Sequence, residues 1–184
     1  MKKIILGLAL AAITLAACNN KSTESKANKA VMYTNSDEKN LSPINELVNQ
    51  YLQIKNGLAN DNGTDAATAG KAFVESIAKV NTASFTTDQK KKWDDISADA
   101  KEMAEHIGAN ADKLEHQREH FEMLSQDIYD LVKTFGAGQV LYKDADTMYN
   151  KGKGAFWLSE IKEIKNPYMG KAMFDSGSIK EEIK

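Results

Sequence analysis

The sequence predicts a mainly α-helical protein, an antiparallel four-helix bundle that carries a small C-terminal cap of short β-strands and turns. Up to about residue 138, apolar residues recur at intervals of three and four in four segments joined by short connections. From residue 139 that spacing stops, and aromatic residues, glycines and the second of two prolines crowd together. Such a stretch is too apolar to stay unfolded. We therefore expect a single domain at 41–184, with the cap at about 139–179.

The first residues predict export and lipid anchoring. Residues 1–17 join Lys2 and Lys3 to an uncharged apolar run that is too short to span a bilayer, as is typical of a signal peptide. The run ends in Leu15-Ala16-Ala17, directly before the only cysteine, Cys18, and so resembles the lipobox of bacterial lipoproteins. This resemblance implies acylation of Cys18 and a place in the cell envelope, on the periplasmic side of a membrane or at the cell surface. The alternative is an ordinary signal peptide with a chance cysteine.

Residues 18–40 are rich in Asn, Lys, Ser and Glu, and we expect them to form a flexible tether between lipid and domain. Once Cys18 is acylated, no thiol remains for a disulfide or a cysteine metal site. Removal of Lys2 and Lys3 with the signal peptide leaves 22 basic and 26 acidic residues, a net charge of −4. This acidic balance argues against nucleic acid as a partner.

Local signals predict where each helix begins and ends. Capping residues and turn residues mark the boundaries, and apolar residues at helical spacing mark the inward faces. The expected starts are Ser42-Pro43, Thr64, Thr86 or Thr87, and Asp112, and Gly136 is the expected C-cap of the last helix. In the cap we expect strands at 140–142 and 155–158, a turn between them at 151–154, and a second turn at Asn166-Pro167.

No enzyme constellation is visible, and we expect a protein that is not a catalyst. The chain has no nucleophile elbow, no glycine-rich phosphate loop after a strand and no HExxH motif. A di-iron carboxylate site needs Glu-x-x-His on two helices, and the glutamates near the histidines do not have that spacing.

The three histidines, His106, His116 and His120, form the strongest candidate for chemistry. His116 and His120 are one helical turn apart and can share one ion. Met103 precedes His106 by one turn and Met123 follows His120 by one turn, and imidazole with thioether suits copper better than calcium or magnesium. The alternative is a set of surface histidines and core methionines, which periodicity alone favours because such a histidine pair arises easily by chance.

Specific positions in the last two helices and the cap carry a further resemblance, which runs from about Pro43 to the C-terminus. They are His106-Ile107, the run 116–125, Tyr142, Met148, the run 153–158, Asn166-Pro167-Tyr168 and the run 170–173. Through them the chain resembles an uncharacterised family of bacterial envelope domains. Its members occur as small lipoproteins and as the C-terminal domain of periplasmic adaptor subunits of heavy-metal efflux pumps, of the copper and silver type. The resemblance implies a lipid-anchored envelope protein that binds or hands over copper or zinc near such an adaptor.

Two positions depart from that family, whose members usually carry Cys-Pro-Met in the cap and Cys-Gly near the end. This chain has Asp146-Thr147-Met148 and Ser176-Gly177 instead. Loss of both thiols fits two cysteines that work as a pair, either as soft-metal ligands or as a disulfide. The candidate ligands that remain are His106, His116, His120, Met148, Met103, Met123 and Asp146. The alternative function is a structural or interaction module that has lost the metal site and docks an envelope partner protein.

Overall fold

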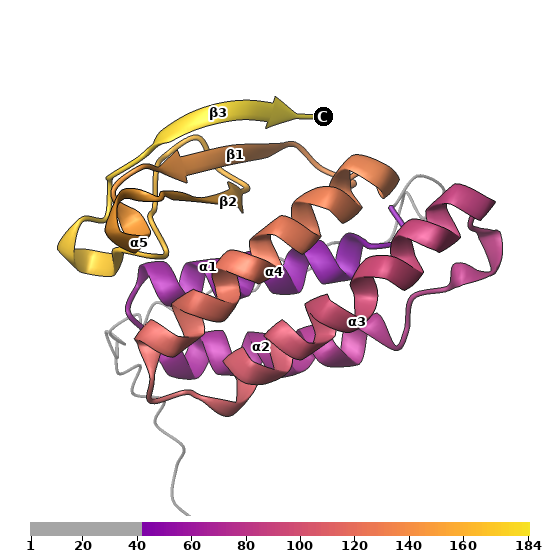
Figure 1. Cartoon of the computed structure of the whole chain (residues 1–184), viewed down its shortest axis with the longest axis horizontal. Coiled ribbons are helices and arrows are strands. Elements are labelled where there is room, and N and C mark those ends of the chain that lie inside the picture. Colours follow the sequence, from indigo (N-terminus) through magenta and orange to yellow (C-terminus); the bar gives the residue numbers. More distant parts are fainter. Residues whose placement is uncertain (1–41) are drawn as a thin grey trace, which may run out of the picture. The chain divides into compact units, whose positions relative to one another are not determined.

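Four long helices and a three-stranded sheet make up most of residues 42–184, the part of the chain that the computed structural model describes (Figure 1). Consecutive helices pack against one another, and the first also contacts the fourth. The prediction of a mainly helical protein with a small C-terminal sheet is confirmed. The helices are α1 (Asn45–Ala59), α2 (Gly63–Ile77), α3 (Thr87–Ala109) and α4 (Leu114–Phe135).

Two of the helix boundaries follow the predicted capping signals. Thr86 caps α3, because its hydroxyl accepts the Gln89 N–H while the Gln89 side chain accepts the Thr86 N–H. This reciprocal pair is a capping box. Gly136 ends α4 with a φ of 76°, a left-handed conformation that glycine adopts without strain.

The other three helix starts differ from the sequence prediction. α2 begins at Gly63, since the side chain of Asn62, rather than Thr64, accepts the Asp65 N–H. α1 begins at Asn45, because the hydroxyl of Ser42 donates to the Gly136 carbonyl at 2.6 Å and so joins the start of α1 to the end of α4. α4 begins at Leu114, after a turn in which the Lys113 N–H donates to the Asn110 carbonyl.

The sheet has the strand order β2-β1-β3, and both pairings are antiparallel. Its strands are β1 (Leu141–Asp146), β2 (Ala155–Ser159) and β3 (Ser178–Ile183). The first two lie where the sequence predicted strands, although β1 is longer. The third strand was not predicted, and it extends the cap to Ile183. The single helical turn α5 (Tyr149–Gly152) connects β1 to β2, and two short 3₁₀ turns are η1 (Thr82–Ser84) and η2 (Gly170–Ala172).

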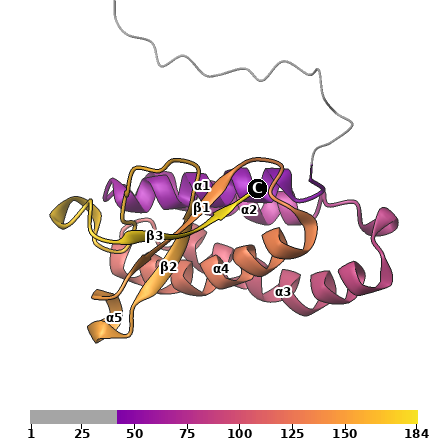
Figure 2. The ribbon, with the colours of Figure 1, turned by 90° about the horizontal axis from the view of Figure 1, so that it is seen from above.

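The sheet packs on α1 and α4, and β1 and β2 cross these helices obliquely (Figure 2). Buried tyrosines hold the two layers together. Tyr51 of α1 stacks on Phe121 of α4 at 5.0 Å, and its hydroxyl accepts the Leu158 N–H of β2 at 2.9 Å. The Tyr168 hydroxyl donates to the Phe156 carbonyl at 2.7 Å. Each hydroxyl thus satisfies a polar group that would otherwise be unpaired in an apolar interface.

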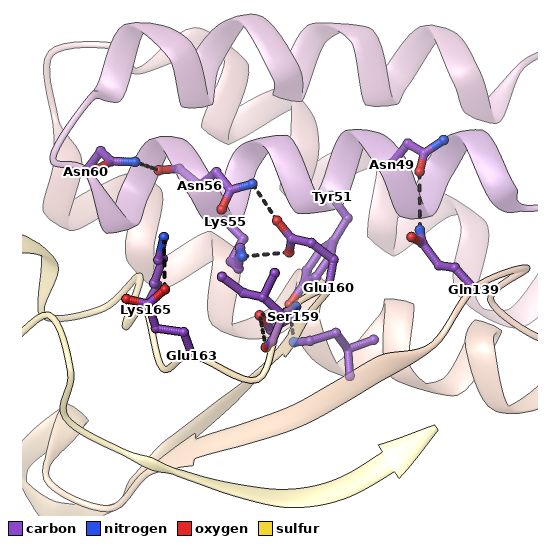
Figure 3. Close-up of polar contacts among 12 residues, drawn as sticks. Asn49, Tyr51, Lys55, Asn56, Asn60, Gln139, Ser159, Glu160, Glu163 and Lys165 are labelled. Carbon is purple, nitrogen blue, oxygen red and sulfur yellow. Dashed lines mark hydrogen bonds and ion pairs between the residues drawn. The ribbon is translucent and has the colours of Figure 1, made fainter. Parts of the chain in front are cut away.

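A buried ion pair also joins α1 to the segment after β2 (Figure 3). The ammonium of Lys55, which is fully buried, donates to a Glu160 oxygen at 2.7 Å, and Asn56 donates to the other oxygen at 2.9 Å. Burial lowers the pKa of Lys55, and the Glu160 carboxylate opposes that shift. Burial also acts to raise the pKa of Glu160, but the Lys55 charge and the two hydrogen bonds outweigh it and lower that pKa. Each charge therefore depends on its partner.

The predicted signal peptide (1–17), Cys18 and the predicted tether (18–40) lie outside the described residues. Their assignment stays a prediction from sequence. None of the helices in the described part of the chain combines the length and hydropathy that a membrane crossing requires.

Candidate metal centre

The three histidines meet where α3 ends and α4 begins. His106 lies in the last turn of α3, and His116 and His120 lie in the first two turns of α4. The connection between the helices is short and held by Asn110, whose side chain donates to the His106 carbonyl at 2.8 Å and accepts from Lys113 at 3.1 Å. The chain therefore reverses direction next to His106, and the start of α4 lies beside the end of α3.

Gln117, which is fully buried, sets how these two helix ends sit together. Its amide nitrogen donates to the Ile107 carbonyl of α3 at 3.0 Å and to the Gly63 carbonyl of α2 at 2.9 Å. A side chain at Gly63 would overlap with the Ala111 carbonyl, so only glycine permits this close approach. Because Ile107 and Gln117 are the chain neighbours of His106 and His116, this clamp fixes the spacing of the two imidazoles.

One ligand nitrogen from each histidine lies within 4.8 Å of the other two. The rings of His106 and His120 stack in parallel at 4.2 Å, and the ring of His116 stands at 82° to that of His120. The Nε2 atoms of His116 and His120 are 3.2 Å apart. The structure thus brings together three residues that the sequence proposed as ligands, and among the described His, Asp and Glu residues Asp146 is not part of this group.

Each histidine also has an outer partner at its second ring nitrogen. Glu119 Oε2 lies 3.6 Å from Nδ1 of His116, and Glu102 Oε1 lies 3.9 Å from Nε2 of His106. Met103 Sδ, from α3, lies 3.4 Å from Nδ1 of His120. In metal sites a hydrogen-bonded outer partner orients the ring and leaves the other nitrogen free for the ion. Of these three contacts, only the one between Met103 and His120 has hydrogen-bond length.

The local electrostatics favour a neutral His120. Burial lowers the pKa of His120, and the neighbouring His106 and His116 lower it further, against the pull of Glu119 and Glu102. A neutral imidazole is the form that binds a metal ion. The lowered pKa of His120 therefore favours the form of its imidazole that can act as a ligand.

The distances suit a small tetrahedral ion. Nitrogens bound at the usual length for zinc stand about 3.3 Å apart. His116 and His120 already meet this spacing at 3.2 Å. The third nitrogen lies within 4.8 Å of the other two, and the side chains of His106 and His116 are 45% and 38% exposed. Three imidazoles leave a fourth position for water or for an incoming ligand.

The remaining predicted ligands lie elsewhere. Met148 is 61% exposed and precedes α5, and Met123 is 47% exposed on α4. Met123 lines a groove of about 860 Å³ between α4 and α5. Asp146 is buried, and its carboxylate accepts hydrogen bonds from Ser176, Asn166 and the Met148 N–H. Burial acts to raise the pKa of Asp146, but these bonds outweigh it and lower the pKa.

A second group of buried ionisable side chains, Asp144 of β1 and Lys55 of α1, was not predicted from the sequence. Asp144 is fully buried, neither carboxylate oxygen has a hydrogen-bond partner, and burial raises its pKa to about 7, against the pull of Lys55. The sequence carried a signal for this cluster, because Lys55 falls one turn after Tyr51 on the apolar stripe of α1. Gln117 carried the same kind of signal, because it falls one turn before Phe121 on the apolar stripe of α4, but only the structure shows which carbonyls it binds.

Comparison with known protein families gives a match. The family model described as "Protein of unknown function (DUF3347)" matches residues 47–140, just over half of the chain. The matched segment begins at the third residue of α1, runs through α4 with all three histidines, Met103 and Met123, and ends before β1. Searches of the curated proteins and of the solved structures give no match.

Proposed function

The chain belongs to the DUF3347 family, whose function is unknown, and from this premise we propose that it is a lipid-anchored envelope protein that binds or hands over copper or zinc. The proposal relates it to the adaptor domains of heavy-metal efflux pumps. The observation that carries it is the convergence of His106, His116 and His120, whose ligand nitrogens lie within 4.8 Å of one another.

The ligand set of this cluster supports transfer of a metal ion to another molecule more than storage of the ion. Imidazole binds both copper and zinc, and three ligands leave one position open to a ligand from another molecule. The exposed sides of His106 and His116 leave that position within reach of a partner. We propose that an efflux-pump adaptor is that partner and that the protein itself catalyses no reaction.

The envelope location rests on the N-terminal sequence. The lipobox-like run before Cys18 supports acylation of that cysteine and anchoring to a membrane. For the scaffold we propose the antiparallel four-helix bundle that the helix spacing predicted, because consecutive helices pack together and α1 also contacts α4.

Metal retention by the purified protein tests the proposal. After incubation with Zn(II) or Cu(II) and removal of free ion, elemental analysis of the intact protein should find about one ion per chain. The double variant His116→Ala/His120→Ala should retain none. The matched control Glu115→Ala/Gln126→Ala changes two exposed residues of the same helix and should retain the ion. If the wild type holds no more ion than the histidine double variant, the proposal fails.

The alternative is an interaction module without a metal site. It is favoured by the engagement of Asp146, whose carboxylate is taken up by Ser176, Asn166 and the backbone of Met148. In that case the cap docks an envelope protein. Binding of the whole protein to an efflux adaptor that is equally strong in the histidine double variant and without added metal would select this alternative.

A further inference from the structure

The imidazole of His120 meets a different neighbour at each nitrogen. Its Nδ1 lies 3.4 Å from the sulfur of Met103, and its Nε2 lies 3.2 Å from Nε2 of His116. Met103 belongs to α3 and His120 to α4, so the sulfur contact crosses between the helices. Met103 is also partly buried and packs against the core, which fixes the place of its sulfur.

We propose that Met103 is a positioning residue, which holds His120 with its proton on Nδ1 and so turns the Nε2 lone pair toward the ion. A thioether sulfur accepts a hydrogen bond weakly and has no hydrogen to donate. The 3.4 Å contact is therefore a hydrogen bond only when Nδ1 carries the proton. A neutral imidazole has one such proton, and Nε2 is left as acceptor and as ligand.

The direction of the bond between His120 and His116 follows from this assignment. Because Nε2 of His120 accepts, the Nε2–H of His116 donates across the 3.2 Å gap in the metal-free protein. Binding of an ion at Nε2 of His116 would require this proton to leave that nitrogen. Glu119 Oε2 lies 3.6 Å from Nδ1 of the same ring, where it receives an N–H once that nitrogen takes up a proton from solvent.

The sulfur contact places Met103 in the role that a carboxylate has beside many metal-bound histidines. Glu119 lies 3.6 Å from His116 and Glu102 lies 3.9 Å from His106, and both distances exceed that of a hydrogen bond. Met103 differs from them because it is uncharged and fixed by packing on the opposite helix. It couples the orientation of His120 to the packing of α3 on α4.

This inference deepens the proposed function, but the tautomer can be measured without any metal. In metal-free protein labelled with ¹⁵N in its histidines, NMR correlations from the ring protons to both ring nitrogens identify the protonated one. We expect Nδ1–H for His120 in the wild type. Met103→Leu keeps the volume and removes the acceptor. The Nε2–H tautomer, which a free imidazole prefers, should then dominate.

Two further variants separate the sulfur contact from general packing. Met103→Gln supplies a carbonyl oxygen as acceptor and should restore the Nδ1–H form. Met123→Leu alters an exposed methionine that follows His120 by one turn on the same helix, and it should leave the tautomer unchanged. A wild-type His120 protonated on Nε2, or a Met103→Leu variant that keeps the wild-type tautomer, overturns the proposal.

Zn(II) affinity gives the second readout. Loss of an outer partner lowers metal affinity by about 10- to 100-fold, so Met103→Leu should lose that much and Met103→Gln should regain most of it. If the wild type binds no ion but His120 carries Nδ1–H only when Met103 is present, the metal function fails and the positioning role stands. If the wild type binds Zn(II) and Met103→Leu changes neither tautomer nor affinity, the positioning role fails and the metal function stands.

Discussion

The hydroxyl of Ser176 donates a hydrogen bond of 2.7 Å to the carboxylate of Asp146, although the two residues stand 30 positions apart. Asn166 donates to the same oxygen at 2.6 Å, and the Met148 N–H donates to the other oxygen at 2.7 Å. One carboxylate thus ties together the end of β1, the Asn166 turn and the segment before β3. Asp146 and Ser176 also occupy the two positions at which the family resemblance implies paired cysteines, and their side chains are in contact.

A cysteine pair at these positions should form a disulfide. We expect Asp146→Cys/Ser176→Cys, in a Cys18→Ser background, to cross-link under oxidising conditions because the side chains already meet. A closed loop of this length stabilises a fold by about 2–4 kcal/mol. Urea unfolding of the same variant, oxidised and reduced, measures the gain. Ser176→Cys alone is the control, and its stability toward urea should be the same under oxidising and reducing conditions. Two free thiols in the oxidised double variant would contradict the prediction.

Replacement of Gln117 should disturb both stability and the histidine cluster. Gln117→Leu removes hydrogen bonds to the Ile107 and Gly63 carbonyls inside the protein. A lost buried bond costs about 1–3 kcal/mol, which urea unfolding will show as a lower midpoint. Because the clamp spaces His106 from His116, Zn(II) affinity should also fall. Gln126→Leu, on the exposed face of the same helix, should change neither, and unaltered metal affinity in Gln117→Leu would refute the clamp.

The contributions of Lys55 and Glu160 to the free energy of unfolding should depend on each other. Lys55→Met leaves the partly buried Glu160 carboxylate, which is 29% exposed, without its 2.7 Å partner. Removal of one member of a buried pair costs about 3–5 kcal/mol, whereas replacing both by apolar residues is often close to neutral. We expect Lys55→Met/Glu160→Leu to be more stable than Lys55→Met. A double-mutant cycle by urea unfolding measures the coupling, and additive single effects would contradict it.

The elements that the sequence predicted are those set by local signals. Apolar spacing located α1 to α4, and the capping box at Thr86 and the glycine at 136 gave two ends correctly. Asn62 rather than Thr64 caps α2 because two capping residues stand close together and the Asn62 side chain accepts the Asp65 N–H. β3 escaped prediction because Ser178–Ile183 is polar and mostly exposed, and only its pairing with β1 makes it a strand.

In the candidate site, too, some residues follow from local sequence signals and others only from tertiary packing. One helical turn places His116 and His120 together, so the sequence alone could propose that pair. His106 joins them only through the packing of α3 on α4, which Gln117 fixes by bonds to residues distant in sequence. Met148 and Asp146 entered the candidate set through resemblance, and the structure places Asp146 in a separate hydrogen-bonded group.

Asp144 should make the protein less stable as the pH rises. Its carboxyl is fully buried without a hydrogen-bond partner, and burial raises its pKa from 3.8 to about 7. Lys55 and Tyr51 of α1 face it, and Glu160 is bound to that lysine. Between about pH 4 and pH 7 the folded state holds a proton that the unfolded chain releases, so the free energy of unfolding falls as the pH increases through this window. The loss is at most about 4 kcal/mol.

Asp144→Asn removes this titration and should gain stability relative to the wild type as the pH rises. Urea unfolding of both proteins at about pH 5, 6, 7 and 8 gives the difference at each pH. The half-buried Asp127, whose pKa is raised to about 6 by burial and by Asp99 and Asp130, contributes to both curves and cancels from that difference. Any fixed cost of the buried amide is the same at each pH and also leaves the slope unchanged. A difference between the two proteins that stays constant over this range would show that Asp144 does not hold its proton in the folded state.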